Sequence, residues 1–409
     1  MALDRKNLAQ LLQQIDALAD QVLGQLPLGD ALRRQVRDKV FGPAFDELKH
    51  IISDSRAPVL YITGRSGDGK SSLINALAER EVAKVGDIEP TTVLAEEHII
   101  DFGAGCRWTV WDSRGFFESS RPTGSAETDA LEAVRDDLAT RRPDVICHVV
   151  SSPQLRSFSE DLRVMKAIGE AVTRRDGSLP PMVMVLTKPD IEGRPGDWPP
   201  EIYPAKTQLL LERLDYGAGL VGGGPLVPIH RDRAWRGGYT RGGDYYALVP
   251  VKVLPGDVHW NLDSLRSVIG ERLPRSAQLQ FFQATRDVEL AKQICRRFVT
   301  DIAAAAAAVA TLPIPLEDVL LITPLQLLMV AFIGAMAGRP LSQKTALEFL
   351  AAAGMNVAGG LVLRQVASAL MKLVPVAGSV VGATIASTGT KAIGESAIAY
   401  FFNDRAYAP

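Results

Sequence analysis

One short stretch of the sequence has the composition of a phosphate-binding loop. The pattern Gly-x4-Gly-Lys-Ser lies between a run that predicts a strand and a run that predicts a helix, at Gly64, Gly69, Lys70 and Ser71. Glycines allow the backbone to approach phosphates, and N–H groups at a helix start attract negative charge. The lysine ammonium binds the β- and γ-phosphates, and the serine hydroxyl coordinates Mg²⁺. Because a carboxylate repels phosphates, Asp68 should point away from them. Nucleotide contacts are expected from Gly64, Arg65, Ser66, Gly67, Asp68, Gly69, Lys70, Ser71 and Ser72.

A second stretch, Thr187-Lys188-Pro189-Asp190, closes a later apolar run. It resembles the base-reading motif [NT]KxD of P-loop GTPases. A carboxylate at Asp190 can accept hydrogen bonds from N1–H and from the exocyclic amine of guanine. Adenine lacks this pair of donors and would leave a buried carboxylate partly unsatisfied. The resemblance therefore implies GTP and GDP as ligands, with base contacts from Thr187, Lys188 and Asp190.

The resemblance also implies two switch segments, assigned by their order along the chain. In the first, a threonine before the second predicted strand should present its hydroxyl to Mg²⁺ and the γ-phosphate. Thr91 and Thr92 are both candidates; the sequence does not choose between them, and Thr92 is the working assignment. In the second, Asp112 should reach Mg²⁺ through water, and the Gly115 N–H should reach the γ-phosphate. The protein ligands expected for the metal are thus Ser71, Thr92 and Asp112.

The loop that stacks on the base departs most from the family pattern, because the usual Ser-Ala pair is missing. We assign it to Val251 and Lys252, which precede the last predicted helix of the nucleotide-binding region. Residues 226–230 are a rival, but no long amphipathic helix follows them.

The resemblance spans roughly residues 55–274 and is to the Era/TrmE-like P-loop GTPases. The motif GxSGxGKSSLINAL is especially close to bacterial Era-like enzymes and to immunity-related GTPases. The C-terminal region is similar to the hydrophobic helical domain of unknown function that often follows such GTPases. The family implies hydrolysis of GTP to GDP and phosphate by a molecular switch.

The usual catalytic group is replaced. Ras-like enzymes carry a glutamine after the second switch glycine to orient the attacking water, and here this residue is Phe116. Gly67 occupies the slot of the asparagine through which TrmE-like enzymes bind K⁺, so K⁺ activation is not expected. Arg65 and Arg114 are candidates for stabilising transition-state charge, in one subunit or across a homodimer; alternatively each is solvated or ion-paired. Slow hydrolysis without a dimer or partner is expected, and the candidate catalytic residues are Lys70, Thr92, Arg114 and Arg65.

Composition restricts the other functions. The formal net charge of the 409 residues is −2, so the overall charge gives no argument for a polyanion partner, although a local patch could still bind one. Three widely spaced cysteines exclude a disulfide framework and fit a reducing cytosol. The N-terminal residues lack the apolar core of a signal peptide. An arginine-, glycine- and aromatic-rich stretch at 231–246 could stack on RNA, although a mobile loop is favoured.

The chain divides into three predicted regions. Residues 1–54 predict an N-terminal helical hairpin, 55–274 an α/β GTPase domain with a Gly/Arg-rich insertion at about 191–246, and 275–409 an apolar all-α domain. A mostly parallel sheet flanked by helices is expected, with strands at 58–63, 93–102, 106–112, 145–151, 182–187 and 247–252. Helices are expected at 71–81, 126–141, 159–174 and 261–273.

The C-terminal region contains two long uncharged runs. Residues 319–338 and 373–390 lack charges and have the length needed to cross a bilayer core. Three residues interrupt the first run, namely Thr323, Pro324 and Gln326. A soluble bundle, conditional or peripheral membrane association and constitutive spanning all remain open. We expect a cytoplasmic protein, with peripheral or conditional insertion at the inner membrane as the alternative.

These observations favour a GTPase switch that couples nucleotide state to the apolar helical domain. Residues 303–400 would then engage a membrane surface or a protein partner. Two alternatives are a GTP-dependent binding module with little hydrolysis and an Era-like RNA-binding assembly factor.

Overall fold

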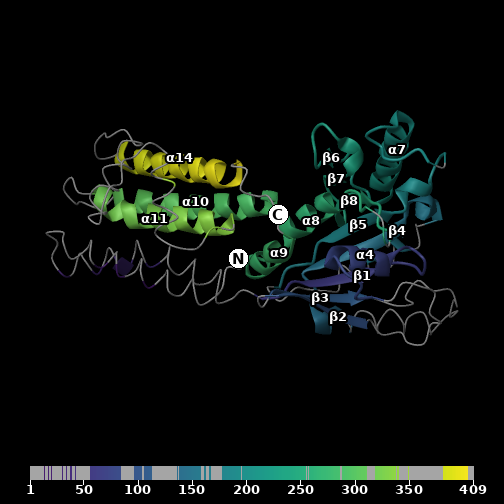
Figure 1. Cartoon of the computed structure of the whole chain (residues 1–409), viewed down its shortest axis with the longest axis horizontal. Helices are drawn as coiled ribbons and strands as arrows, with labels where there is room; N and C mark the ends of the chain where they lie inside the picture. Colours follow the sequence, from purple (N-terminus) through teal and green to yellow (C-terminus); the bar gives the residue numbers. More distant parts are fainter. Residues whose placement is uncertain are drawn as a thin grey trace. The chain divides into compact units, whose positions relative to one another are not determined.

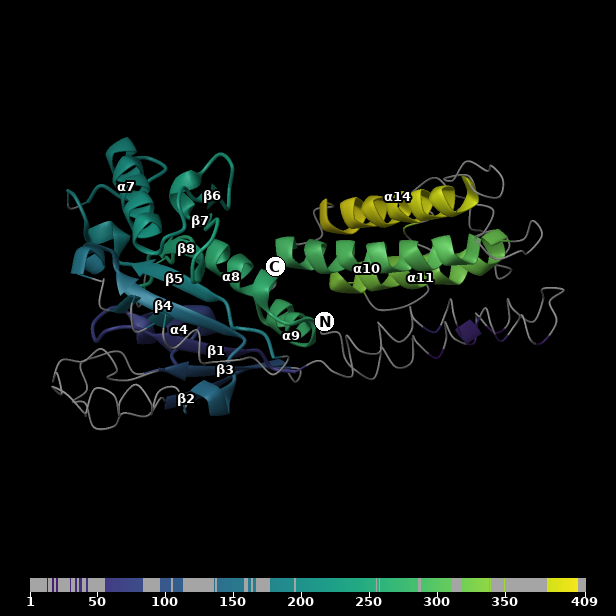
Figure 2. The ribbon, with the colours of Figure 1, turned by 180° about the vertical axis from the view of Figure 1, so that it is seen from behind.

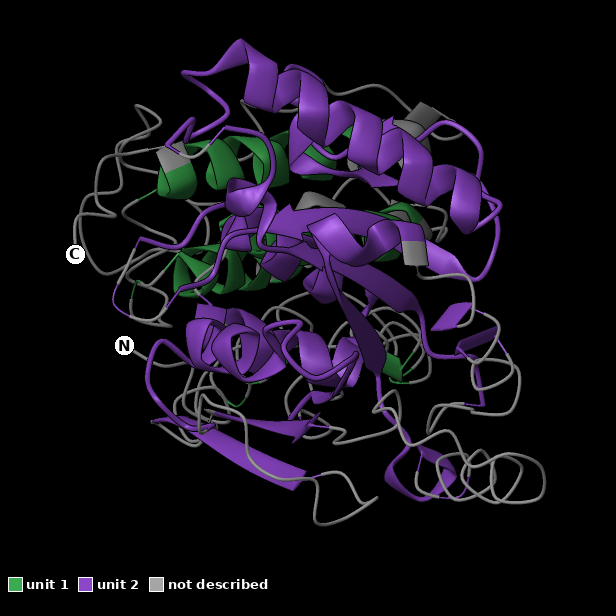
Figure 3. Ribbon diagram, turned by 90° about the vertical axis from the view of Figure 1, so that its right-hand side faces the viewer, with its two compact units in different colours: residues 1–55, 286–409 green, residues 56–285 purple. Residues whose placement is uncertain are grey.

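A computed structural model describes most of the chain between residues 56 and 310 and parts of the rest. The described segments are residues 56–83, 96–103, 106–112, 138–157, 177–194, 196–254, 258–285, 288–310, 318–337 and 381–403, with single residues elsewhere (Figure 1). The chain divides into two compact units (Figure 3). One runs from Arg56 to Thr285, and the other combines Met1–Ser55 with Arg286–Pro409.

The unit from Arg56 to Thr285 is built on a mixed sheet. Within the described residues, eight strands follow the order β2-β3-β1-β4-β5-β8-β7-β6. The central pairs β3-β1, β1-β4, β4-β5 and β5-β8 are parallel, whereas β2-β3, β8-β7 and β7-β6 are antiparallel. The strands are β1 Val59–Thr63, β2 Glu96–Gly103, β3 Cys106–Asp112, β4 Val145–Ser151, β5 Met182–Thr187, β6 Val227–Pro228, β7 Gly238–Tyr239 and β8 Tyr245–Val251.

Helices cover both faces of this sheet, as Figures 1 and 2 show. Helix α7 (Pro204–Leu220) packs on β8, and its Leu214 belongs to a cluster with Ile146, Met184 and Leu248 from the strands. Helices α4 (Lys70–Ala78) and α8 (Leu262–Arg272) contact each other on the opposite face. Helix α9 (Arg275–Thr285) packs on β3.

The expected α/β architecture is confirmed, with a mixed sheet in which the four central strand pairs are parallel. Strands β1, β4 and β5 are buried along their whole length, which explains why they are continuous apolar runs in the sequence. The helices expected at 71–81 and 261–273 correspond to α4 and α8. Most of the helices expected at 126–141 and 159–174, and almost all of the N-terminal hairpin, lie outside the described residues.

Residues 191–246 are more regular than the sequence indicated. We expected an insertion without regular structure, but helix α7 occupies a large part of it. Its Pro204 lies in the first turn, where a missing N–H costs nothing. Position 217, inside the helix, holds a glycine because a Cβ there would lie only 2.7 Å from Leu248 Cδ2. The glycine therefore reflects close helix–sheet packing, although in the sequence it suggested a loop.

In the second unit, the described helices α10 (Val288–Ala310), α11 (Asp318–Met336) and α14 (Val381–Asn403) pack against one another (Figure 1). The rings of Phe298 and Phe332 lie 4.6 Å apart between α10 and α11. Gly394 allows α14 to approach α10, since a Cβ there would lie 2.4 Å from Val299 Cγ2. These three helices confirm the expectation of helices in the C-terminal region.

Helix α11 has no exposed face where its side chains are described. All residues from Leu325 to Met336 are buried. Within them Gln326 Nε2 donates to Thr390 Oγ1 of α14 at 3.1 Å, which satisfies two polar groups in an apolar interior. The described part of the first uncharged run is thus buried, in contact with α10 and α14. A search of the described helices finds none that is long and apolar enough to cross a membrane.

The close approach of α14 to α10 predicts a large cost for a side chain at position 394. Gly394→Leu should destabilise the protein by about 1–3 kcal/mol, because the branched side chain of Val299 cannot move aside without repacking. The measurement is the midpoint of thermal or urea unfolding of the full chain. The control is Ala399→Leu, at an exposed site of the same helix. Equal midpoints for the two variants would contradict the packing described.

Candidate functional site

The phosphate loop connects β1 to α4, and its glycines have conformations that other residues rarely adopt. Gly64 has φ 149°, and a Cβ there would lie 2.2 Å from the carbonyl oxygen of Val149 on β4. Gly67 and Gly69 have φ 79° and 92°. Gly69 directly precedes the first turn of α4, so the loop delivers the chain to a helix N-terminus. This is the backbone arrangement that binds phosphates.

The Lys70 ammonium lies against the phosphate loop. Its Nζ donates to the carbonyl oxygens of Gly64 and Arg65, both at 3.0 Å. Ser71 follows in the first turn of α4, while Ser66 is exposed at the tip of the loop. Lysine and serine thus have the positions that phosphate and Mg²⁺ contacts require.

Asp112 ends β3 beside β1 and is buried. Its Oδ1 atom accepts no hydrogen bond from the described residues. Burial raises the pKa of this carboxyl, and the positive charges of Lys70 and His98 act in the opposite direction. A buried carboxylate oxygen without a donor is what a water molecule on Mg²⁺ would satisfy. Asp112 and Ser71 therefore fit a magnesium–nucleotide complex.

Asp68 points into the protein, away from the loop tip. Its side chain is 1% exposed, and its Oδ2 accepts a hydrogen bond from the Arg65 N–H at 3.2 Å. Burial raises the pKa of this carboxyl. Hydrogen bonds from backbone N–H groups and the positive charges of Lys70 and Arg65 act in the opposite direction. The orientation is the one that the sequence led us to expect.

The base loop follows β5 and is hydrogen-bonded to the phosphate loop. Thr187 Oγ1 donates to the carbonyl oxygen of Asp68 at 2.5 Å, and Lys188 Nζ donates to that of Gly67 at 2.5 Å. Lys188 has φ 54°, and a short 3-10 turn from Pro189 to Ile191 follows it. This turn carries Asp190. Two segments that are far apart in the sequence therefore form one continuous surface.

The end of β8 lies next to the base loop. Val251 is the register partner of Thr187, and Lys252 exchanges backbone hydrogen bonds with Trp260. The rival segment 226–230 contains β6, at the far edge of the sheet. The strand order thus puts Val251 and Lys252, and not the rival, beside the base loop.

Arg65 is engaged in an ion pair within the unit. Its Nε and Nη2 atoms donate to the two carboxylate oxygens of Asp161 at 2.7 and 2.8 Å. Asp161 is buried and its partner is one-third exposed. Of the two arginines considered for catalysis, Arg65 therefore has the ion-paired arrangement. Arg114 lies outside the described residues, and so do Thr91, Thr92, Gly115 and Phe116.

The interior behind the phosphate loop is polar. His148 on β4 and Tyr245 on β8 share a buried hydrogen bond of 2.6 Å. Burial, and secondly the charge of Arg65, lower the pKa of His148 to about 3, so this imidazole is neutral at physiological pH. Burial and the nearby Asp161 raise the pKa of Tyr245. No sequence motif announced this cluster, because its members come from separate elements.

The sequence also did not indicate three charged residues beside the base loop. Lys206 and Arg213 extend from α7 to this loop and to Glu192, which follows it. Charged residues on a helix usually face water, so their types alone gave no signal.

The arginine- and tyrosine-rich segment before β8 is used for internal contacts. Arg236 forms an ion pair with Glu201 at 3.3 Å. The hydroxyls of Tyr239 and Tyr246 both donate to the carboxylate of Glu271. The aromatic residues that suggested RNA stacking therefore stabilise the unit.

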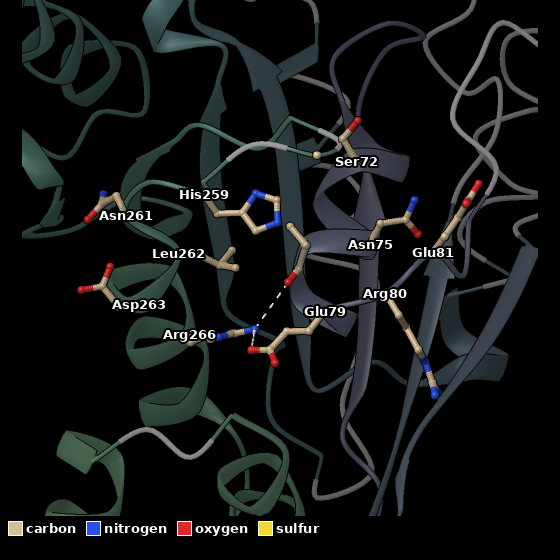
Figure 4. A pocket seen from close by; sticks show the side chains of 12 residues that line it. Ser72, Asn75, Glu79, Arg80, Glu81, His259, Asn261, Leu262, Asp263 and Arg266 are labelled. Carbon is tan, nitrogen blue, oxygen red and sulfur yellow. Dashed lines mark hydrogen bonds and ion pairs between the residues drawn. The ribbon is translucent and has the colours of Figure 1, made fainter. Parts of the chain in front are cut away.

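A cavity of about 760 Å³ opens between α4 and α8 (Figure 4). Arg266 borders it and binds the Glu79 carboxylate at 2.9 Å, where the two helices meet. Ser72, which follows the Mg²⁺-ligand candidate, lines one side, and His259 from the loop after β8 lines the other. Of the residues predicted to contact the nucleotide, Ser72 is the one that lines this cavity.

The fold and these loops define a P-loop nucleotide-binding domain. Residues 59–188 match the family model described as 50S ribosome-binding GTPase. No curated protein matches the chain.

Several solved structures match part of the chain. Toc33 from Arabidopsis thaliana, in complex with Mg²⁺ and GMPPNP, is 17% identical over 66% of this chain and 96% of its own, with a TM-score of 0.33. Era from Aquifex aeolicus, bound to GDP·AlF4⁻, is 17% identical over 63% and 68%, with a TM-score of 0.34. A GTP-binding protein from Sulfolobus solfataricus, in complex with GDP, is 16% identical over 66% and 67%, with a TM-score of 0.32. Similarities of this size transfer no ligand or partner to this chain.

The ion pair of Arg65 leads to a prediction that separates structure from catalysis. Arg65→Met should destabilise the protein by about 1–3 kcal/mol, because it leaves the buried Asp161 carboxylate unpaired. The double variant Arg65→Met/Asp161→Leu should recover most of this stability and hydrolyse GTP at close to the wild-type rate. Unfolding midpoints and single-turnover rates at saturating GTP measure the two effects. An arginine that stabilises the transition state is worth about 10³–10⁵ in rate, so a loss of that size in the double variant would contradict the ion-pair role.

Proposed function

We propose that this chain is a molecular switch that binds GTP with Mg²⁺ and hydrolyses it to GDP and phosphate. The observation that carries the proposal is the direct hydrogen bonding between the two predicted nucleotide-binding loops, from Thr187 and Lys188 to the carbonyls of Asp68 and Gly67. This contact brings the phosphate-binding glycines and the base-reading Asp190 to one end of the sheet. A single nucleotide can then bind both.

The residues present fit the ligands. Lys70 and the N–H groups of the loop would bind the phosphates, Ser71 and Asp112 the Mg²⁺ ion and its water, and Asp190 the guanine base. The Mg²⁺ ion would neutralise charge that develops on the phosphates during hydrolysis. Asp112, which is buried and interacts with the charge of Lys70, would supply negative charge to hold the cation. Thr92 and Gly115 are the proposed contacts to the γ-phosphate.

The output of the switch is a change in association and not the conversion of a metabolite. A γ-phosphate that favours one arrangement of the switch segments supplies the difference in affinity that such coupling needs. The apolar helical domain, through residues 303–400, is the proposed receiver. It would engage a protein partner or a membrane surface, with the protein cytoplasmic or conditionally bound at the inner membrane. Its hydrolysis would be slow until a homodimer or partner completes the site.

A second candidate is a GTP-dependent binding module with little hydrolysis of its own. Two features favour it: Phe116 cannot orient a water molecule, and Arg65 is paired with Asp161. Under this proposal, Arg114 or a partner would be needed for turnover.

Guanine recognition can be tested at Asp190. Asp190→Asn should lower GDP and GTP affinity about 10–100-fold, because an amide presents a donor to the guanine N1–H or amine. Xanthine nucleotides, which carry a carbonyl in place of the amine, should gain affinity in the same variant. Titration of fluorescent nucleotides measures both, with the partly exposed Asp197→Asn as the control. Equal affinity of the wild type for ATP and GTP, unchanged in the variant, would disprove the assignment.

Turnover and fractionation distinguish the two candidates. The switch proposal predicts GTP hydrolysis that rises at high protein concentration or with liposomes, and Lys70→Ala should remove nucleotide binding and turnover together. It also predicts different membrane or partner association of the full chain with GDP and with a non-hydrolysable GTP analogue. GTP binding without turnover under any of these conditions would leave the binding module as the function.

A further inference from the structure

We propose that Lys206 on α7 is a positioning residue for guanine recognition, because its buried ammonium holds the turn that carries Asp190. The inference rests on the proposed function, in which Asp190 accepts hydrogen bonds from the guanine base. It adds a specificity-determining element, helix α7, that lies outside the nucleotide-binding motifs.

The contacts of Lys206 are concentrated on this one turn. Its side chain is only 2% exposed. Its Nζ donates to the carbonyl oxygen of Pro189 at 3.4 Å, to that of Asp190 at 3.1 Å, and to that of Glu192. A lysine ammonium has three N–H donors. Its whole donor capacity is therefore spent on the main chain next to the base-reading carboxylate.

Glu192 gives the same turn a second attachment through its side chain. Arg213, two helical turns after Lys206 and on the same side of α7, donates Nε to both Glu192 carboxylate oxygens at 2.9 and 3.1 Å. The Ser152 hydroxyl, directly after β4, donates to Glu192 Oε2 at 2.9 Å. The turn is thereby fixed to a helix and to the sheet.

Asp190 lies between two anchored ends. Before it, Thr187 and Lys188 are hydrogen-bonded to the phosphate loop. After it, Glu192 is bound by Lys206 and Arg213. A carboxylate must accept two hydrogen bonds from guanine at once, so its position and angle both matter. The hydrogen bonds to the phosphate loop fix one end of the turn, and those to α7 fix the other.

Burial of a lysine is otherwise unfavourable. Charged groups are almost never fully buried unless they are paired or hydrogen-bonded. The carbonyl oxygens around Lys206 compensate this cost, and without the ammonium they would lose their donor. A Met side chain of similar length would fill the space and leave the turn free to shift.

The experiment compares the binding of GDP and IDP to the full chain by calorimetry. IDP lacks the exocyclic amine, so it forms only one of the two hydrogen bonds to Asp190. The wild type should prefer GDP by about tenfold or more, the value of one hydrogen bond to a charged group. Lys206→Met should reduce this preference about tenfold, toward equal affinity. A purely structural lysine would weaken both ligands to the same extent.

Two further variants make the result decisive. Leu214→Ala creates a cavity in the apolar cluster between the same helix and the sheet, and should lower the unfolding midpoint while the GDP/IDP ratio stays at the wild-type value. Arg213→Met should lower the ratio through Glu192, and it decides the case if Lys206→Met does not fold. An unchanged GDP/IDP ratio in Lys206→Met overturns the inference; if that variant does not fold, an unchanged ratio in Arg213→Met overturns it. In either case, GDP binding by the wild type upholds the proposed function. A wild type without preference for GDP over IDP overturns both.

Discussion

The side chains of Thr187 and Lys188 extend from the end of β5 to main-chain carbonyls of the phosphate loop. Because both acceptors are backbone atoms, the contact depends on the course of that loop and not on its side chains. The course in turn requires glycine at position 64, where β4 lies too close for a Cβ. Strand β4 lies between β1 and β5, so its position sets the spacing of the two loops. Sheet order, loop conformation and nucleotide binding are thus linked through a few main-chain contacts.

The charges near these loops are arranged at a cost to stability. Burial raises the pKa values of Asp68 and Asp112, so each carboxylate is less favourable when ionised in the folded chain than in water. A bound cation would relieve this cost at Asp112. The opposite solution is found beside the base loop, where Glu192 has Arg213 and Ser152 as partners. At Asp112 the uncompensated charge lies where a cation is expected, and at Glu192 the compensated charge lies where a loop must be held still.

Sequence reasoning succeeded where the local pattern reflects one dominant constraint. Strands β1, β4 and β5 are apolar throughout because both of their faces are buried, and the phosphate loop is recognisable because its backbone needs glycines at fixed positions. It failed where the constraint comes from distant residues. Gly217 suggested a loop, although a glycine is needed there because Leu248 of β8 lies so close to the helix. Nothing near Lys206 in the sequence indicates the carbonyl groups to which it donates.

Apart from Gln326 and Gly334, every residue of helix α11 from Leu325 to Met336 has an apolar side chain, and α14 supplies part of their cover. During synthesis this helix emerges before α14 does. At about 5–20 residues per second, translation from Met336 to Asn403 takes roughly 3–13 s. Of the described helices that pack on α11, only α10 precedes it in the chain and is available during that interval. The nascent chain therefore exposes a surface that chaperones, lipid or other nascent chains can occupy, and the yield of folded protein depends on which of them does.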